Sequence, residues 1–238
     1  MERLDKIISN LGYGSRKDVK SFAKKGIIEV DGLIVKDSAM LVDPEKSVIK
    51  INGEEVLYRK YIYIMMNKPD GVISATHDNR DETVIDLLNL EHQVFDPFPI
   101  GRLDKDTVGL LLLTNDGELN HRLISPKWHV DKVYYAEIDK SVDEKDIKAF
   151  KDGITLDDGY KCLEANLEIL SSSNDGSEIR LTIQEGKFHQ VKRMFEAVGK
   201  KVTYLKREEF GGLLLDPDLE EGEYRELTDE ELSLLKSY

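Results

Sequence analysis

Two carboxylates lie in the most chemically informative stretch of the sequence, where a charged loop leads into an apolar segment. The loop reads Gly101-Arg102-Leu103-Asp104-Lys105-Asp106-Thr107, and residues 109–114 after it are almost wholly apolar. Asp104 and Asp106 could act as a general acid–base pair or as metal ligands. Aspartate is also common in turns, where it bonds to its own backbone, and local chemistry alone favours that interpretation.

A second informative stretch, residues 184–194, joins a predicted strand to a predicted helix. It contains His189, which could bind a metal or act as a base, although no histidine or carboxylate spacing around it indicates zinc. A lone histidine more often forms hydrogen bonds or stacks on another ring. Seven basic residues and one acidic residue, Glu196, lie within residues 187–207 and predict a basic patch. The basic residues are Lys187, Lys192, Arg193, Lys200, Lys201, Lys206 and Arg207.

The elements that must position these side chains follow from hydrophobic periodicity and turn signals. Strands are predicted at residues 61–66, 109–114, 132–138 and 179–183. Helices are predicted at 84–88, from 117 through Leu123, at 143–150, at 191–198 and after the Thr228–Glu231 capping box. Residues 171–174 are expected to form a short polar loop. Helices interspersed with several strands predict an α+β domain.

Residues 1–59 predict a separate helix–helix–hairpin module. Leu4, Ile7, Ile8 and Leu11 have the spacing of a short amphipathic helix. Ser15 and Asp18 predict a capping box for a second helix that stops at Gly26. Tight hairpins are expected at Asp31-Gly32 and Asn52-Gly53. Lys17, Lys20 and Lys24, which we call the lysine stripe, share one face of the second helix and suit either a solvated surface or a phosphate-binding one.

The composition is that of a folded protein, but its charge is distributed unevenly. The chain has 238 residues, 40% of them hydrophobic, and a formal net charge of -13. The module of residues 1–60 is nevertheless slightly basic, with 12 basic and 10 acidic residues. The single cysteine, Cys162, excludes a disulfide framework and is expected to be structural. No apolar run has membrane-spanning length and the N-terminus lacks a signal-peptide core, so a cytoplasmic protein is expected.

Several motifs, in the right order along the chain, resemble the RNA pseudouridine synthases, in the branch that contains ribosomal small-subunit pseudouridine synthase A. The resemblance covers nearly the whole chain, and residues 1–59 resemble the S4 RNA-binding module. The motifs are Met66-Asn67-Lys68-Pro69-Asp70-Gly71, Gly101-Arg102-Leu103-Asp104 with Asp106-Thr107 and Gly109-Leu110, His121-Arg122-Leu123-Ile124-Ser125-Pro126, Lys132-Val133-Tyr134, and Glu185-Gly186-Lys187-Phe188-His189-Gln190-Val191-Lys192-Arg193-Met194.

The resemblance implies a role for each matching residue. Asp104 would be the catalytic aspartate, as nucleophile or as base, with Lys192 as its cationic partner and Tyr134 stacked on the uracil. Arg102 would hold the RNA or fill the space left by the extruded base. Asp106 and Thr107 would shape the loop. Gln190 and His189 could contact the RNA or position the loop. The remaining expected RNA contacts are Arg193, Lys187, Arg3, Arg16, Lys17, Lys20 and Lys24.

The resemblance also implies a cofactor-free and metal-free isomerisation of uridine in ribosomal RNA, with the RNA of the small subunit as the expected substrate. It predicts an S4-like domain at residues 1–59 and a mixed, mainly antiparallel catalytic domain with flanking helices at 60–238. The expected partner is ribosomal RNA or a small-subunit assembly intermediate, with no membrane and with the chain as a monomer. One alternative is a non-catalytic S4-type RNA-binding or ribosome-assembly protein. Another is a metal-dependent hydrolase that uses Asp104 and Asp106.

Overall fold

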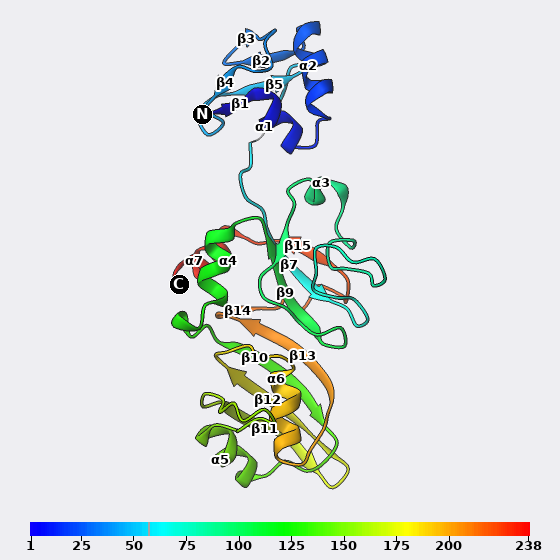
Figure 1. Cartoon of the computed structure of the whole chain (residues 1–238), viewed down its shortest axis with the longest axis vertical. Helices are drawn as coiled ribbons and strands as arrows, with labels where there is room; N and C mark the ends of the chain where they lie inside the picture. Colours follow the sequence, from blue (N-terminus) through cyan, green and yellow to red (C-terminus); the bar gives the residue numbers. More distant parts are fainter. Residues whose placement is uncertain (57) are drawn as a thin grey trace. The chain divides into compact units, whose positions relative to one another are not determined.

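The structure is a computed structural model that describes residues 1–56 and 58–238. Its contacts divide the chain into two compact units (Figure 1). One comprises Met1–Ile62 with Leu88–Pro97, and the other comprises Tyr63–Leu87 with Phe98–Tyr238. Within the described ranges, no helix combines the length and apolar character that crossing a bilayer requires.

The first unit is built from short helices and two small sheets. A four-stranded antiparallel sheet has the order β3-β2-β5-β6, and β1 pairs with β4. Its elements are β1 (Glu2–Arg3), α1 (Leu4–Asn10), α2 (Arg16–Lys25), β2 (Ile28–Val30), β3 (Leu33–Ile34), β4 (Leu41–Val42), β5 (Ile49–Ile51), β6 (Glu54–Glu55) and α3 (Leu90–Gln93).

The predicted local signals of this unit are confirmed. The Ser15 hydroxyl accepts a hydrogen bond from the Asp18 amide, and the Asp18 carboxylate accepts one from the Ser15 amide, so the capping box is closed in both directions. Gly26 ends α2 in the left-handed conformation at φ 72°. Both hairpins form at the expected turns. The apolar side of α1 then packs with Val19, Ala23 and the buried strand residues into one core.

The second unit is organised around one mixed sheet with the strand order β11-β12-β10-β13-β9-β7-β15. All neighbours in this order are antiparallel except β9 and β13, so the predicted α+β class is confirmed. The elements are β7 (Tyr63–Lys68), β8 (Phe98–Pro99), β9 (Val108–Thr114), α4 (Gly117–Ile124), η1 (Pro126–Trp128), β10 (Lys132–Ile138), α5 (Glu144–Asp152), β11 (Asn166–Ser173), β12 (Gly176–Ile183), α6 (Gln190–Ala197), β13 (Val202–Phe210), β14 (Leu213–Leu214), β15 (Tyr224–Glu226) and α7 (Asp229–Lys236).

Helices cover the sheet of this unit at both of its ends. Helices α4 and α7 pack Leu119, Leu123 and Leu235 against side chains of β7, β9 and β13 in one core cluster. Helices α5 and α6 meet through Phe150 and Phe195, whose ring centroids are 4.8 Å apart.

Two local predictions are wrong. Residues 84–88 form turns rather than a helix, because the Val84 amide donates to the Ile73 carbonyl and the Asp86 carboxylate binds the Thr83 amide and hydroxyl. Residues 171–173 belong to the edge strand β11 instead of a loop. An edge strand needs no apolar face, and pairing with β12 satisfies its backbone.

Candidate active site

The loop that carries Asp104 is fixed at the residue before it. The Leu103 amide donates to the Ser74 hydroxyl oxygen at 3.1 Å, and that hydroxyl donates to the Leu103 carbonyl at 3.0 Å. On the other side, the Thr107 amide closes a turn on the Asp104 carbonyl at 3.1 Å. The backbone from Asp104 to Thr107 therefore forms a turn, as one of the interpretations predicted, and Asp104 is the first residue of that turn.

A buried lysine also holds the loop that carries Asp104. Lys68, the last residue of β7, is fully buried, and its ammonium donates to the carbonyls of Pro69, Lys105 and Thr107 at 2.9, 3.2 and 3.0 Å. Burial lowers the pKa of Lys68 to about 8, and the nearby carboxylates, including Asp104 and Asp106, oppose this effect. At neutral pH the Lys68 ammonium is thus a cation near the Asp104 and Asp106 carboxylates.

Gly109 lets the two middle strands come together next to this loop. It faces Arg207 across the parallel pair of β9 and β13. A Cβ at position 109 would lie 2.3 Å from the Arg207 carbonyl oxygen, a distance that no real side chain tolerates. The backbone is also left-handed at φ 98°, which favours glycine. The apolar strand thereby starts at a fixed distance from β13.

Helix α6 brings the predicted cationic partner to Asp104. The Lys192 ammonium lies 3.0 Å from Asp104 Oδ2 and 2.5 Å from Asp106 Oδ1. The side chains of Lys192 and Asp104 are 19% and 27% exposed, whereas Asp106 is 70% exposed. Burial acts to lower the pKa of Lys192, but its hydrogen bonds to Asp106 and Asp104 outweigh burial and raise it. The Lys192 contact in turn lowers the pKa of Asp106.

A hollow of about 450 Å³, solvent-open space included, lies beside this ion pair. Arg102 is exposed at its edge, and Tyr134 of β10 is buried in its wall. The residues that line it are Arg102, Leu103, Asp104, Thr107, Tyr134, Ile183, Gly186, Lys187, His189, Gln190, Val191, Lys192 and Leu205. The structure thus brings the three predicted catalytic residues to one pocket.

The loop before α6 places His189 at the pocket. His189 Nε2 lies 3.6 Å from Asp104 Oδ1, and its backbone is left-handed at φ 48°. The Phe188 ring stacks on the His189 ring with 3.8 Å between centroids and 18° between planes. Phe188 itself is 72% exposed. The stacking interpretation of His189 therefore describes its contact within the protein.

Gln190 supports this loop from inside. Its amide nitrogen donates to Glu185 at 2.7 Å, and its amide oxygen accepts from the Lys187 backbone at 2.8 Å. Glu185 also accepts from the Tyr160 hydroxyl at 2.7 Å. Lys187 is exposed, with its ammonium 4.4 Å from the centroid of the Tyr160 ring. Gln190 is 4% exposed, so of its two predicted roles the contacts favour loop positioning.

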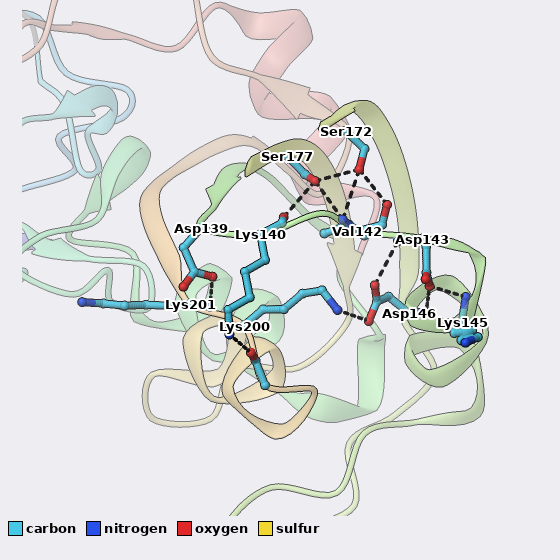
Figure 2. Close-up of polar contacts among 11 residues, drawn as sticks. Asp139, Lys140, Val142, Asp143, Lys145, Asp146, Ser172, Ser177, Lys200 and Lys201 are labelled. Atoms are coloured by element: carbon cyan, nitrogen blue, oxygen red, sulfur yellow. Dashed lines mark hydrogen bonds and ion pairs between the residues drawn. The ribbon is translucent and has the colours of Figure 1, made fainter. Parts of the chain in front are cut away.

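The basic residues 187–207 do not form the single surface patch that the sequence predicts. Arg193 pairs with Asp157 and Asp158 and points away from Asp104. Lys200 donates to Asp146 at 2.7 Å in a nearly buried pair, and the Lys201 backbone binds Asp139 (Figure 2). Arg207 lies inside the sheet at 2% exposure. Asp157 and Asp158 thus neutralise Arg193, and Asp146 neutralises Lys200.

The cations predicted for the N-terminal module differ in their surroundings. Arg3 forms a two-point contact with Asp5, through Nε at 3.0 Å and Nη2 at 2.6 Å. Arg16 and the lysine stripe are exposed on α2. Among the described residues, no ion pair joins the lysine stripe to a carboxylate. The stripe is therefore available to a ligand of negative charge, unlike Arg3.

The surroundings of Cys162 and of the two loop carboxylates bear on their chemistry. Burial raises the pKa of the Cys162 thiol to about 11, so the thiol is protonated at neutral pH. In residues 1–56 and 58–238, no group of three or more histidine, cysteine, aspartate or glutamate side chains could hold a metal ion. Asp104 and Asp106 instead share the ammonium of Lys192.

Sequence reasoning missed three residues that build the site. Lys68 and Ser74 hold the Asp104 loop, and Arg207 is the partner of Tyr134 in the pairing of β10 and β13. Lys68 belongs to a recognised motif, but the motif gives no sign that its ammonium binds backbone carbonyls. Ser74 and Arg207 carry no local signal, because their contacts lie 29 and 97 residues away in the chain.

Comparisons with known proteins place this fold and site in a class. The RNA pseudouridylate synthase family model matches residues 62–197, and the S4 domain model matches residues 2–48. The chain belongs to the RNA pseudouridylate synthase family, which confirms the resemblance found in the sequence. A crystal structure of a pseudouridylate synthase, 36% identical, covers 99% of this chain and 100% of its own with a TM-score of 0.69.

Similar full-length relatives come from several bacteria. The uncharacterized RNA pseudouridine synthase YtzG of Bacillus subtilis is 53% identical over 98% of both chains. Ribosomal small subunit pseudouridine synthase A of Vibrio cholerae is 40% identical over 97% of this chain and 98% of its own. Ribosomal large subunit pseudouridine synthase B of Bacillus subtilis is 39% identical over 100% of this chain and 96% of its own.

Proposed function

We propose that this chain converts a specific uridine of small-subunit ribosomal RNA into pseudouridine. The observation that carries the proposal is the partly buried Asp104–Lys192 pair at the edge of a pocket walled by Tyr134. Family membership supports the reaction, and the relatives named for the small subunit support the choice of RNA. The Asp106-Thr107-Val108-Gly109 form of the loop resembles the small-subunit enzyme more than its large-subunit relatives, which supports the same choice.

Asp104 acts on the sugar of the target nucleotide. The bond between C1′ and N1 breaks, the uracil turns within the site, and C5 bonds to C1′. The C5 proton then leaves and N1 takes up a proton, so atoms and charge balance without an oxidant or a cofactor. A carboxylate can serve either as nucleophile at C1′ or as base on the sugar. Both roles need an ionised Asp104 and an open side of the carboxylate toward the pocket.

Lys192 keeps that carboxylate ionised while a base covers it. Closing the pocket with an apolar ring face removes water from Asp104, which disfavours its charged form. A cation 3.0 Å away opposes this effect. Asp106 shares the ammonium at 2.5 Å and so fixes its position from the solvent side. The Lys68 ammonium, which donates to the Thr107 carbonyl, adds a second positive charge next to the loop.

Tyr134 and Arg102 receive the target nucleotide. A uridine inside folded RNA must leave its stack, at a cost of a few kcal/mol. Tyr134 offers a ring in the pocket wall on which the uracil stacks, and stacking on an aromatic ring returns about 1–3 kcal/mol. Arg102, exposed at the edge, is placed to contact the RNA backbone or to enter the vacated space. Lys187 and His189 offer further contacts on the same edge.

We also propose a division of labour between residues 1–59 and 60–238. The S4-like module binds RNA phosphates through Arg16 and the lysine stripe, and the second domain carries the chemistry. Exposed cations on a helix without carboxylate partners suit phosphate contacts. The enzyme would work as a monomer in the cytoplasm, on ribosomal RNA or on a small-subunit assembly intermediate.

Pseudouridine maps of ribosomal RNA from cells with and without the gene test this function. We expect one small-subunit position to lose its pseudouridine and to regain it when the wild-type chain is supplied. The Asp104→Asn variant should fail to restore it. Loss of a large-subunit position instead would refute the choice of RNA while keeping the reaction. Unchanged maps together with no activity of the purified chain would refute the function.

A further inference from the structure

Arg207 is a buried cation that the proposed chemistry leaves without a task. It lies in β13 between Tyr134 of β10 and Gly109 of β9, and it is 2% exposed. The pairing of β10 and β13 is irregular at this point, because Val133 faces Glu209 while Tyr134 faces Arg207. The extra residue, Glu208, is the mark of a β-bulge. Bulges beside active sites re-aim a side chain, and here the re-aimed side chain is Arg207.

The surroundings of the guanidinium do not neutralise it. Its Nε donates to the Leu110 carbonyl at 2.8 Å, and its Cζ lies 5.0 Å from the centroid of the Phe210 ring. Within the described residues, Nη2 has no hydrogen-bond partner and no carboxylate pairs with the side chain. Lys132, on the same ring at 5.4 Å, is a second cation, and burial together with the charge of Arg207 lowers its pKa to about 8.

Tyr134 is the cross-strand partner of Arg207, in register with it between β10 and β13. Burial lowers the pKa of Arg207, and the neighbouring Tyr134 opposes that effect. An arginine has only donors, so any hydrogen bond between the two groups uses the phenol oxygen as acceptor. The hydrogen of the Tyr134 hydroxyl then has to point elsewhere. Since Tyr134 lines the pocket, the pocket is the open direction.

Stability gives no reason for this arrangement. An unpaired buried charge is costly, and replacing buried ionic groups by apolar ones of similar volume is often neutral or stabilising. We propose that Arg207 is a positioning residue of the synthase site, which holds the Tyr134 hydroxyl as an acceptor and leaves its hydrogen to face the pocket. This inference rests on the proposed function and deepens the role of Tyr134 in it.

A double-mutant cycle on the full-length chain tests the inference. The variants are Arg207→Met, Tyr134→Phe and their combination, with Arg180→Met as the matched control, because Arg180 is a sheet arginine that is 42% exposed and paired with Glu208 and Glu168. The readouts are tritium release from C5-labelled uridine in an rRNA fragment at saturating enzyme, the RNA concentration dependence, and urea unfolding. Arg207→Lys keeps the charge and serves as the conservative variant.

We expect Arg207→Met to lower the single-turnover rate about tenfold to a hundredfold, the value of a hydrogen bond to a charged group, with little change in RNA affinity. Arg207→Lys should recover part of this loss, and Arg180→Met should stay near wild type. In the Tyr134→Phe background, Arg207→Met should cost less than threefold. The urea midpoint of Arg207→Met should equal or exceed that of wild type.

Several results would overturn the inference. One is a full loss from Arg207→Met in the Tyr134→Phe background, and another is full activity of Tyr134→Phe. Strong destabilisation by Arg207→Met beside a fully active Arg207→Lys would show that the charge serves the fold. A wild-type chain that releases no tritium would refute the proposed function itself, whereas an active Arg207→Met beside an impaired Tyr134→Phe would refute only the role of Arg207.

Discussion

Replacing Lys192 by methionine should slow the chemical step while leaving RNA binding nearly intact. The change keeps the length of the side chain and removes the charge that lies 3.0 Å from Asp104. At that distance two unit charges attract by about 5.5 kcal/mol at an effective dielectric constant of 20, and by about 1.4 kcal/mol in bulk water. The pair is 19% and 27% exposed, which places it between these limits.

A loss of about 3 kcal/mol in transition-state stabilisation corresponds to roughly a hundredfold lower rate. We expect this loss in single-turnover tritium release at saturating Lys192→Met enzyme. Arg193→Met is the matched control, since it removes a cation from the next position of α6 that pairs with Asp157 and Asp158. Its chemical step should stay within threefold of wild type. A Lys192→Met rate within threefold of wild type, or an equal loss in both variants, would refute the proposed partnership of Lys192 and Asp104.

Three further outcomes are expected. Changing the lysine stripe to alanine should reduce the slope of log affinity for rRNA against log salt by about 2, since each lost phosphate contact removes roughly 0.7–0.9. The same change at three lysines of α5 (Lys145, Lys148 and Lys151) should leave the slope unaltered. An unchanged slope in the stripe variant would make the stripe only a solvated face. Lys200→Met should lower the free energy of unfolding by about 3 kcal/mol because it strands the buried Asp146, whereas Lys201→Met should leave urea midpoints almost unchanged. Lys68 has a pKa near 8 in the folded chain and 10.5 when unfolded, so between these pH values the unfolded state binds more protons and stability rises with pH. Over that window the urea-derived stability of wild type should gain about 2–3 kcal/mol relative to Lys68→Met, and parallel curves would contradict the burial of this charge.

Signals that are local in sequence predicted local structure well. The Ser15–Asp18 and Thr228–Glu231 capping boxes form, and both glycine hairpins turn where expected. Each depends on hydrogen bonds or backbone dihedrals within four residues. Residues 132–138 also form a strand with the predicted bounds, while the first strand of the second unit begins at Tyr63 rather than at residue 61.

The central strand β13 could not be predicted, for a reason that also hides part of the site. Its sequence, Val202 through Phe210, contains Lys206, Arg207, Glu208 and Glu209 in succession, a composition typical of an exposed loop. The strand exists because β10 and β9 pair with it on both sides. Arg207 is buried because a bulge and the missing Cβ of Gly109 make room for it. These causes lie about 70 to 100 residues away, where no window along the sequence finds them.

The Asp104 site shows an intermediate case. The loop motif indicated which carboxylate matters, and the family resemblance named Lys192 as its cationic partner. The distance of 3.0 Å between Lys192 and Asp104 requires the parallel approach of β9 and β13 and the clamp by Lys68. The motif therefore predicts the identity of the groups, and the tertiary structure supplies their distance.

The most direct test of the central role of Asp104 is tritium release by the Asp104→Asn variant, with Asp106→Asn beside it. Both substitutions keep the side-chain volume and remove one charge from the same loop. We expect Asp104→Asn to release no tritium above background while it binds the rRNA fragment as tightly as wild type, and Asp106→Asn to keep most of the activity. Substantial turnover by Asp104→Asn would contradict the assignment, as would loss of turnover by Asp106→Asn alone.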